Sequence, residues 1–400
     1  MQPERRVVSS PRAAIAGIGQ TDFSRNSGRS EHVLALEATL SAVEDAGLSV
    51  ADIDGVARYQ KDATEEAHLV EALGLRDLRY FGQLGYGGSG SCGVIAHAAA
   101  MVCAGQATHV LCYRSLNGRS GTRFGQGSHY IDTVDTCVGI ARSDITVGSP
   151  LTGPFGLLAP AHQMAMWIRS YSQTYGLDDE QTARMLGAVA VSQRELAHAN
   201  PSAILRGRPL TLADYLDSQI LADPLRLYDF CLETDGAVAA IVTTADRARD
   251  LRQPPVQIAA AQQHMSRYSE PLHLYKEDLA SFLPSYVAAE LFAAADITPE
   301  DVDIAAIYDA STVMVPLALE DFGFCERGTA AEFLASGEQN LQGSLPINTH
   351  GGLLSEGYIN GFNTVTEAVR QLRGSAANQV QGAQYAFVTA AGASSLILRN

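Results

Sequence analysis

The sequence predicts an α/β protein built from two similar halves, with parallel strands covered by helices on both faces. Three observations lead to this expectation. Strand-like and helix-like segments alternate along most of the chain, the order found near the N-terminus returns in the last part of the chain, and the stretch between the two copies has a different, helix-rich pattern. An internal echo of this kind indicates a duplicated unit.

The first unit opens with a strand-like segment, Ala13–Gly17, which leads to a helix at Glu31–Ala46 with apolar residues at helical spacing. The stretch GLSVADIDGVARY at 47–59 follows. A glycine-rich turn then precedes an apolar helix at Cys92–Ala104, and a strand at His109–Tyr113 closes the unit. The first unit is therefore predicted to have a strand–helix–strand pattern.

The second unit repeats this order. DITPEDVDIAAIY at 296–308 parallels the stretch at 47–59, including an acidic turn followed by a strand. The remaining segments are a strand at Val256–Ala261, a helix at Tyr286–Ala295, a glycine-rich stretch at Gly351–Gly361, a helix through Arg373 and a strand at Tyr385–Ala390. We expect the two units to superpose, with adjacent sheets and with the helix starts at Ser89–Ser91 and Leu353–Ser355 directed at one shared site.

This pattern divides the chain into an N-terminal half, 12–255, and a C-terminal half, 256–400. The first half contains an insertion at about 116–225, with helices expected at Pro160–Tyr175 and Asp179–Ala199. Long loops in a compact protein usually pack over a functional site. The insertion is therefore expected to form a lid over the ligand.

Composition excludes several classes of protein. The net charge of −16 argues against a nucleic-acid partner, since phosphate binding requires a basic face. The six cysteines show neither a C-x-x-C pair nor metal-ligand spacing, which predicts reduced thiols and no metal site. Neither a signal peptide nor an apolar run of about 20 residues is recognised. We therefore expect a cytoplasmic protein without a membrane span.

Four stretches resemble the sterol-carrier-protein-x branch of the thiolase superfamily, often described as lipid-transfer proteins, and the similarity extends over nearly the whole chain. They are NPSAILRGRPLTLADYL at 200–216, ADPLRLYDFCLETDGAV at 222–238, NTHGGLLSEGYINGFN at 348–363 and FVTAAGASS at 387–395. The resemblance implies the five-layer αβαβα thiolase fold, a CoA thioester as substrate and at least a homodimer.

The chain departs from thiolases at their catalytic positions. The slot of the nucleophilic cysteine falls on Gly88, and Cys92 lies about one turn further along, where it is expected to point into the core. The histidine motif Gly-His-Pro reads Gly357–Ile359, and the Asn-Glu-Ala-Phe motif reads Tyr308–Ser311. The late acid/base cysteine falls near Ala390. The groups for acyl transfer are thus missing at independent positions.

Tyrosines occupy two of these positions, Tyr308 and Tyr358. This arrangement resembles the steroid side-chain aldolases of the superfamily, in which paired tyrosines are catalytic. A tyrosine hydroxyl can donate or accept a proton when its surroundings help. The resemblance implies retro-aldol cleavage of a β-hydroxyacyl-CoA, such as a 17-hydroxy steroid thioester. His350 is a second acid/base candidate, and Asp309 either orients Tyr308 or caps a following helix.

Further candidates are groups that bind the substrate. An enolate oxygen needs hydrogen-bond donors, and helix starts and glycine turns supply backbone N–H groups. Ser89, Gly90 and Gly392 are the candidates for this role. Four arginines are candidates for the CoA phosphates: Arg119, Arg123, Arg206 and Arg208.

Two other interpretations stay open: a Claisen-type thiolase that uses Cys92, and a non-catalytic acyl-CoA or lipid-binding subunit. No cofactor is expected beyond the CoA of the substrate. The resemblance also implies a separate partner with an OB fold and a zinc ribbon, in some cases fused to a hydratase. This chain lacks the cysteine pattern of such a ribbon.

Overall fold

The computed structural model describes most of the chain. The described residues are 12–60, 62–85, 90–121, 123, 134–135, 140–141, 153–157, 159–264, 278–284, 286–390 and 392–400. Two positions singled out from the sequence, Gly88 and Ser89, lie outside these ranges.

Strands of the first half form one side of a nine-stranded sheet in the order β1-β9-β4-β2-β3. Their bounds are Ala13–Gln20 (β1), Asp235–Thr244 (β9), Val110–Asn117 (β4), Gly55–Tyr59 (β2) and Tyr80–Leu84 (β3). β1 and β4 both pair antiparallel with β9, whereas β2 pairs parallel with β4 and β3. The chain therefore returns to the first half after the insertion to supply β9.

Strands of the second half repeat this order as β10-β13-β12-β11. Their bounds are Val256–Gln263 (β10), Ser394–Arg399 (β13), Tyr385–Ala390 (β12) and Ile304–Ala306 (β11). β13 pairs antiparallel with β10 and β12, and β11 pairs parallel with β12. The pairing senses match those of the first half, with β10, β13, β12 and β11 in the places of β1, β9, β4 and β2. The prediction of parallel strands was wrong for most of this sheet, because β9 and β13 return antiparallel to their neighbours in each half.

The two sets of strands join into one sheet where β1 pairs antiparallel with β10. Ala14 faces Gln257, and Ile15 faces Val256, so the junction is short. The expectation of two adjacent sheets was thus incomplete, because the edge strands of the two halves share hydrogen bonds.

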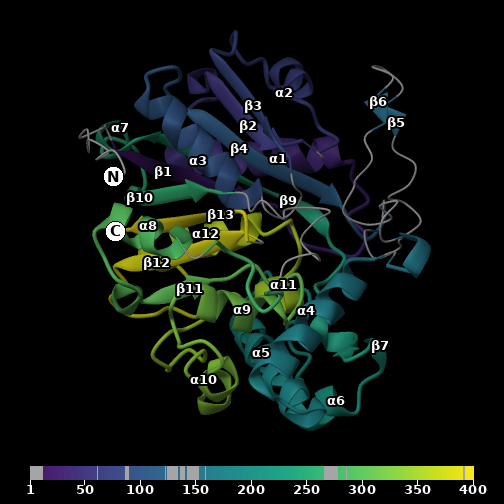
Figure 1. Ribbon diagram of the computed structural model, residues 1–400. Coiled ribbons are helices and arrows are strands. Elements are labelled where there is room, and N and C mark those ends of the chain that lie inside the picture. Colours follow the sequence, from purple (N-terminus) through teal and green to yellow (C-terminus); the bar gives the residue numbers. More distant parts are fainter. Residues whose placement is uncertain are drawn as a thin grey trace.

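Helices complete a layered arrangement (Figure 1). α3 (Gly90–Cys103) and α12 (Phe362–Leu372) contact each other and strands of both halves, so they form the middle layer. α1 (Glu31–Ala46) covers the outer face of the first half, and α8 (Tyr286–Ala295) covers β10 and β13. One hydrophobic core lies around α3 and α12, where burial of aliphatic side chains from both halves stabilises the fold.

Local signals explain why these helices form where they do. The Ser30 side chain accepts a hydrogen bond from the Val33 N–H at the start of α1, and Gly47, at φ 72°, ends the helix in the left-handed conformation. α1 and α8 have the bounds predicted from the sequence, whereas α3 begins two residues before the predicted Cys92. Other helices are α2 (Glu66–Leu73), α7 (Ala245–Ala248), α9 (Met314–Asp321), α10 (Ala330–Ser336), α11 (Gly352–Ser355) and the short 3₁₀ helices η1 (Val50–Asp52) and η7 (Pro299–Asp301).

The insertion contains the two predicted helices with the predicted bounds, α4 (Pro160–Tyr175) and α5 (Asp179–Ala199). α5 packs against α10 and α11 of the second half (Figure 1). The smaller elements here are β5 (Val134–Asp135), β6 (Ile140–Ala141), η4 (Gly153–Phe155), α6 (Leu212–Leu216), β7 (Ile220–Ala222), β8 (Leu225–Arg226) and η5 (Leu227–Asp229). Over the described parts of the chain, no helix has the length and apolar character needed to cross a membrane.

Candidate active site

The hydroxyls of Tyr308 and Tyr358 lie 2.9 Å apart and form a hydrogen bond. Tyr308 follows β11, and Tyr358 lies in the loop between α11 and α12. Their ring centroids are 6.3 Å apart, and the rings meet edge to face. Although 50 residues separate the two tyrosines in the sequence, the fold brings both hydroxyls to one point, as the sequence predicted.

Buried hydrogen bonds fix the two loops that carry this tyrosine pair. The Asn348 side chain accepts from the Ile307 N–H and donates to the Ile307 carbonyl, both at 2.8 Å. The Tyr358 N–H donates to Thr234 Oγ1 at 2.9 Å. The two Asn348 contacts join the motifs that carry Tyr308 and Tyr358. The Thr234 contact ties Tyr358 to the segment that enters β9.

Gly361 allows Tyr308 to pack beside the start of α3. Its φ of +75° lies in the left-handed region, where a side chain is disfavoured. A Cβ at this position would lie 2.5 Å from the Tyr308 ring and 3.4 Å from Ser91 Oγ. The N-terminus of the buried helix and Tyr308 are therefore neighbours around this glycine.

Burial raises the pKa of both tyrosines, but their surroundings differ. The hydrogen bond from Tyr308, the positive charge of Arg114 and the donor on Asn360 all act to lower the pKa of Tyr358, against burial and the nearby Cys231 thiol. For Tyr308, the interaction with Tyr358 adds to the effect of burial and raises the pKa further. Tyr358 is thus the member of the pair whose phenolate has compensating donors.

Asn360 and Arg114 connect Tyr358 to a buried charge. Asn360 Nδ2 donates to the Tyr358 hydroxyl oxygen at 2.8 Å, and Arg114 Nε donates to Asn360 Oδ1, also at 2.8 Å. Arg114 Nη1 pairs with Asp62 Oδ2 at 3.1 Å, with both side chains almost fully buried. Sequence reasoning missed Arg114 and Asn360, although an arginine directly after the apolar strand predicted at His109–Tyr113 was a signal of a buried charge.

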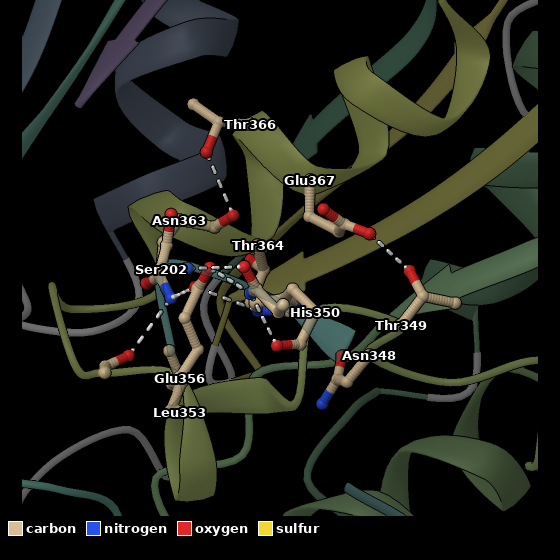
Figure 2. A network of polar contacts seen from close by, with 12 residues as sticks. Ser202, Asn348, Thr349, His350, Leu353, Glu356, Asn363, Thr364, Thr366 and Glu367 are labelled. Carbon is tan, nitrogen blue, oxygen red and sulfur yellow. Dashed lines mark hydrogen bonds and ion pairs between the residues drawn. The ribbon is translucent and has the colours of Figure 1, made fainter. Parts of the chain in front are cut away.

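His350, the second acid/base candidate, lies in a different polar network (Figure 2). Its ring is fully buried, and Nε2 is 3.7 Å from Glu356 Oε2. Neither ring nitrogen has a hydrogen-bond partner in the described part of the chain. Burial lowers the pKa of His350 to about 4 and raises that of Glu356. The structure therefore does not join the His350 ring to the tyrosine pair.

Side-chain amides organise the carboxylates around His350. Asn363 Nδ2 donates to Glu356 Oε2 at 2.6 Å, and Asn200 of the insertion donates to Glu356 Oε1 at 2.9 Å. Thr349 Oγ1 donates to Glu367 at 2.6 Å, as Figure 2 shows. These contacts fasten the insertion to the residue that ends α11, and they fasten α12 to residues on both sides of α11.

Asp309 caps a helix, and that helix is α11. Its carboxylate accepts from the Leu353 N–H at 2.9 Å and the Leu354 N–H at 3.4 Å. Gly352 permits this approach, because a Cβ there would lie 2.2 Å from Asp309 Oδ2. Burial raises the pKa of Asp309 to about 7, against the lowering effect of these N–H groups. The cap thus joins the two tyrosine motifs.

Cys92 is fully buried in the first turn of α3, as predicted. Its Sγ lies 3.7 Å from the Val388 carbonyl oxygen of β12. Burial raises the pKa of the thiol well above its usual value, so it stays protonated at neutral pH. A protonated thiol in the core is a poor nucleophile.

The three oxyanion candidates have different placements. Gly90 begins α3 and is buried beside the Tyr59 ring. Gly392, at φ +75°, lines a small pocket together with Tyr308, Phe282 and Met314, among others. Its carbonyl oxygen lies 2.5 Å from His264 Nε2. Ser89 lies outside the described residues.

The four arginines proposed for CoA fall into two pairs. Arg119 and Arg123 both form ion pairs with Glu233, at 3.3 and 2.6 Å. Arg206 and Arg208 are exposed on the turn that follows α5. The structure does not bring the two pairs into one described contact.

Comparison with known proteins identifies a matching family model and related sequences. The family model described as "Thiolase C-terminal domain-like" matches residues 268–396. A "17-hydroxy-3-oxo-4-pregnene-20-carboxyl-CoA lyase" of Mycobacterium tuberculosis is 44% identical, over 95% of this chain and 96% of the relative. A "Steroid side-chain-cleaving aldolase" of Thermomonospora curvata is 40% identical, over 94% of each.

Solved structures agree with these relatives. A structure described as "Ltp2-ChsH2(DUF35) aldolase" superposes with a TM-score of 0.87 at 39% identity, covering 98% of both chains. Human mitochondrial 3-ketoacyl-CoA thiolase superposes with a TM-score of 0.67 at 14% identity, covering 98% of this chain and 99% of that one, which shows the shared fold alone.

Proposed function

This chain belongs to the thiolase superfamily, in the branch that contains steroid side-chain-cleaving aldolases, and from that membership we propose that it is a retro-aldolase acting on a steroid β-hydroxyacyl-CoA. The observation that carries the chemistry is the 2.9 Å contact between the Tyr308 and Tyr358 hydroxyls in the positions of two thiolase catalytic groups. A 17-hydroxy steroid with a CoA-activated side chain is the proposed substrate.

The reaction needs a base and a proton donor. The base removes the β-hydroxyl proton, the electron pair of that O–H bond forms the new ketone, and the Cα–Cβ bond breaks. Its electron pair passes to the thioester as an enolate, which takes a proton at Cα. The products are a 17-ketosteroid and propionyl-CoA, or acetyl-CoA from a side chain that is one carbon shorter at Cα. Neither a redox partner nor a covalent intermediate is required.

The tyrosine pair can supply both proton transfers. Tyr358 accepts the hydroxyl proton as it passes its own proton to Tyr308, and the donors around the Tyr358 oxygen stabilise the negative charge that develops there against the effect of burial. Tyr308 protonates the enolate. The hydrogen bond between the two hydroxyls carries the proton from Tyr358 to Tyr308, so both tyrosines are neutral before and after the reaction. We assign the enolate oxygen to the start of α3 near Gly90, where N–H groups lack helical acceptors.

Burial of Cys92 argues against the Claisen alternative, since a thiolase nucleophile must be a thiolate that reaches the thioester. For the CoA phosphates we favour Arg206 and Arg208, because Glu233 already neutralises part of the charge on Arg119 and Arg123. The insertion, which contacts α11 through α5, is the proposed lid.

We further propose that the working form is a cytoplasmic homodimer joined to a separate OB-fold and zinc-ribbon protein. Support comes from the related structure, whose description couples an aldolase to a DUF35 component. A fused hydratase on that partner would supply the β-hydroxyl group. No cofactor enters the proposed reaction besides the CoA of the substrate.

One incubation tests the reaction type. The protein, alone and with a DUF35 partner, is mixed with 17-hydroxy-3-oxo-4-pregnene-20-carboxyl-CoA, and products are followed by mass spectrometry. Equimolar 17-ketosteroid and propionyl-CoA are expected. Thiolytic products that appear only when free CoA is added would instead indicate Claisen chemistry, and an unchanged substrate under both conditions would exclude turnover of this thioester.

A further inference from the structure

We propose that Asn360 and Arg114 are positioning residues that hold Tyr358 ready to act as the base, an inference that rests on the proposed aldolase function. Neither side chain needs to touch the substrate. Both act through hydrogen bonds that present an N–H donor to the Tyr358 oxygen.

Chemistry determines the orientation of the Asn360 amide. A guanidinium can only donate, so the Asn360 atom 2.8 Å from Arg114 Nε must be the amide oxygen. The amide nitrogen must then face Tyr358, and it donates to the hydroxyl oxygen at 2.8 Å. Arg114 thereby compels Asn360 to present an N–H group to Tyr358. A phenolate gains from this donor, whereas a neutral phenol gains less.

Arg114 is itself held from several sides. Nη1 pairs with Asp62 at 3.1 Å and donates to the Ser115 carbonyl at 2.6 Å. Asp62 also accepts from the Ser115 N–H and hydroxyl at 2.6 and 2.8 Å. A buried guanidinium with this many partners has one geometry. The direction of the hydrogen bond into Asn360 is therefore fixed before the substrate arrives.

The backbone of Asn360 is fixed as well. Its φ is +49°, in the left-handed region that asparagine tolerates better than most residues. Its carbonyl accepts the Tyr59 hydroxyl at 2.9 Å. A residue with an amide side chain and tolerance for this conformation is required at one position, and asparagine meets both demands.

The charged and titratable groups that face Tyr358 come from several elements. Tyr308 lies 2.9 Å away, Arg114 reaches in from β4, and Cys231 approaches from the segment before β9. Tyr59, at the end of β2, contacts the backbone of Asn360. Asn360 and Tyr308 can both donate to Tyr358, and the negative form of Cys231 would oppose its ionisation. Because these donors surround the Tyr358 oxygen, Tyr358 is the proton acceptor of the pair and Tyr308 is the proton donor.

Asn360→Asp is the sharpest perturbation, because aspartate has the same shape and also tolerates a positive φ. One carboxylate oxygen would still meet Arg114, and the other would replace the N–H facing Tyr358 with an acceptor. Tyr358 would then have to keep its proton. Asn360→Gly, which removes the amide without backbone strain, is the second variant. Tyr59→Phe is the control, since it loosens the Asn360 backbone but leaves the amide in place.

The first readout is independent of turnover. A fluorinated tyrosine placed at position 358 or 308 brings phenol ionisation into an accessible pH range and reports it by ¹⁹F NMR. The residue at 358 should ionise at lower pH than the one at 308. Asn360→Asp should raise the pKa at 358 by about 1 or more. Tyr59→Phe should leave it close to its original value. The opposite order, or no response to Asn360→Asp, would overturn the inference.

The second readout is turnover of the steroid thioester. Asn360→Asp should lower kcat by about 10²-fold or more with little change in KM, and it should have little further effect in a Tyr358→Phe background. Normal kcat in Asn360→Asp, or an equal loss in both backgrounds, would contradict the positioning role while the aldolase function stands. Absence of ketosteroid from the wild-type protein would refute the aldolase function, and the NMR titration would still decide the role of Asn360.

Discussion

Two buried clusters of ionisable groups surround Tyr358 and His350, and the hydrogen-bond partners available in the two clusters differ. Around Tyr358, the donors of Tyr308, Asn360 and Arg114 compensate a developing negative charge. Around His350, both ring nitrogens lack hydrogen-bond partners among the described residues, and the nearby Glu356 is held by asparagine amides.

The difference shows what burial alone can do. Burial disfavours the charged form of every group, so it keeps His350 neutral and makes both tyrosines weaker acids. Only a cluster with donors aimed at one oxygen can favour a charged intermediate there. For two residues of the same motif we therefore propose different roles, catalysis for Tyr358 and structural fastening for the network around His350.

The largest expected effect comes from removing one hydroxyl of the pair. Tyr308→Phe and Tyr358→Phe should each lower kcat by about 10²–10⁴-fold, because each deletes a proton-transfer group while the ring still packs. His350→Gln in the other cluster should change kcat by less than about tenfold. Steady-state kinetics on the three purified variants, with circular dichroism to verify folding, compare the clusters directly. A loss in His350→Gln as large as that in Tyr358→Phe would remove the distinction.

A second prediction concerns stability at acid pH. The folded-state pKa of His350, about 4, lies below its unfolded value of 6.5, so the stability that comes from keeping it neutral is complete above pH 6.5. It is lost as the pH falls from about 6.5 to about 4, and the loss amounts to about 3 kcal/mol. His350→Gln should therefore unfold with a weaker dependence on pH in this window. The matched control is exposed His198→Gln, which should retain the wild-type slope in urea titrations.

Asp309 should show the opposite sign. Its folded-state pKa of about 7 lies above the ordinary value of 3.8, so the stability it contributes is complete below pH 3.8 and is lost as the pH rises through about 7. Asp309→Asn keeps an oxygen that can accept from Leu353 and does not ionise. Relative to wild type, this variant should gain stability between pH 5 and pH 8. Parallel thermal unfolding curves at the two pH values would contradict the shift.

The smallest effect is expected at Cys92. Cys92→Ala removes a buried sulfur that has no role in the proposed reaction, so kcat should stay within about tenfold of wild type. Intact-mass spectrometry during turnover should detect no acyl adduct. An adduct on Cys92, together with loss of turnover in the variant, would restore the Claisen alternative.

Much of the fold could be predicted from the sequence where local signals are strong. α1, α4, α5, α8 and β12 have the bounds that periodicity and flanking residues indicated. The junction of β1 with β10 was not predicted, because pairing of two edge strands depends on how the halves are oriented and leaves no local pattern.

The site was predicted in part, for a related reason. The convergence of the tyrosines followed from their positions in two catalytic motifs of a known fold. The contact of Arg114 with Asn360 joins residues 246 positions apart in the sequence, and no local sequence pattern predicts it. Long-range polar contacts of this kind become visible only when strands and loops have been placed in space.

A double-mutant cycle on Tyr308 and Tyr358 tests the central claim most directly. Turnover of the steroid thioester is measured for the wild type, Tyr308→Phe, Tyr358→Phe and the double variant. If the hydroxyls act as one proton-transfer unit, the double variant should be nearly as active as the slower single variant. If instead the two losses multiply, each tyrosine acts independently, and the account of a coupled pair is contradicted.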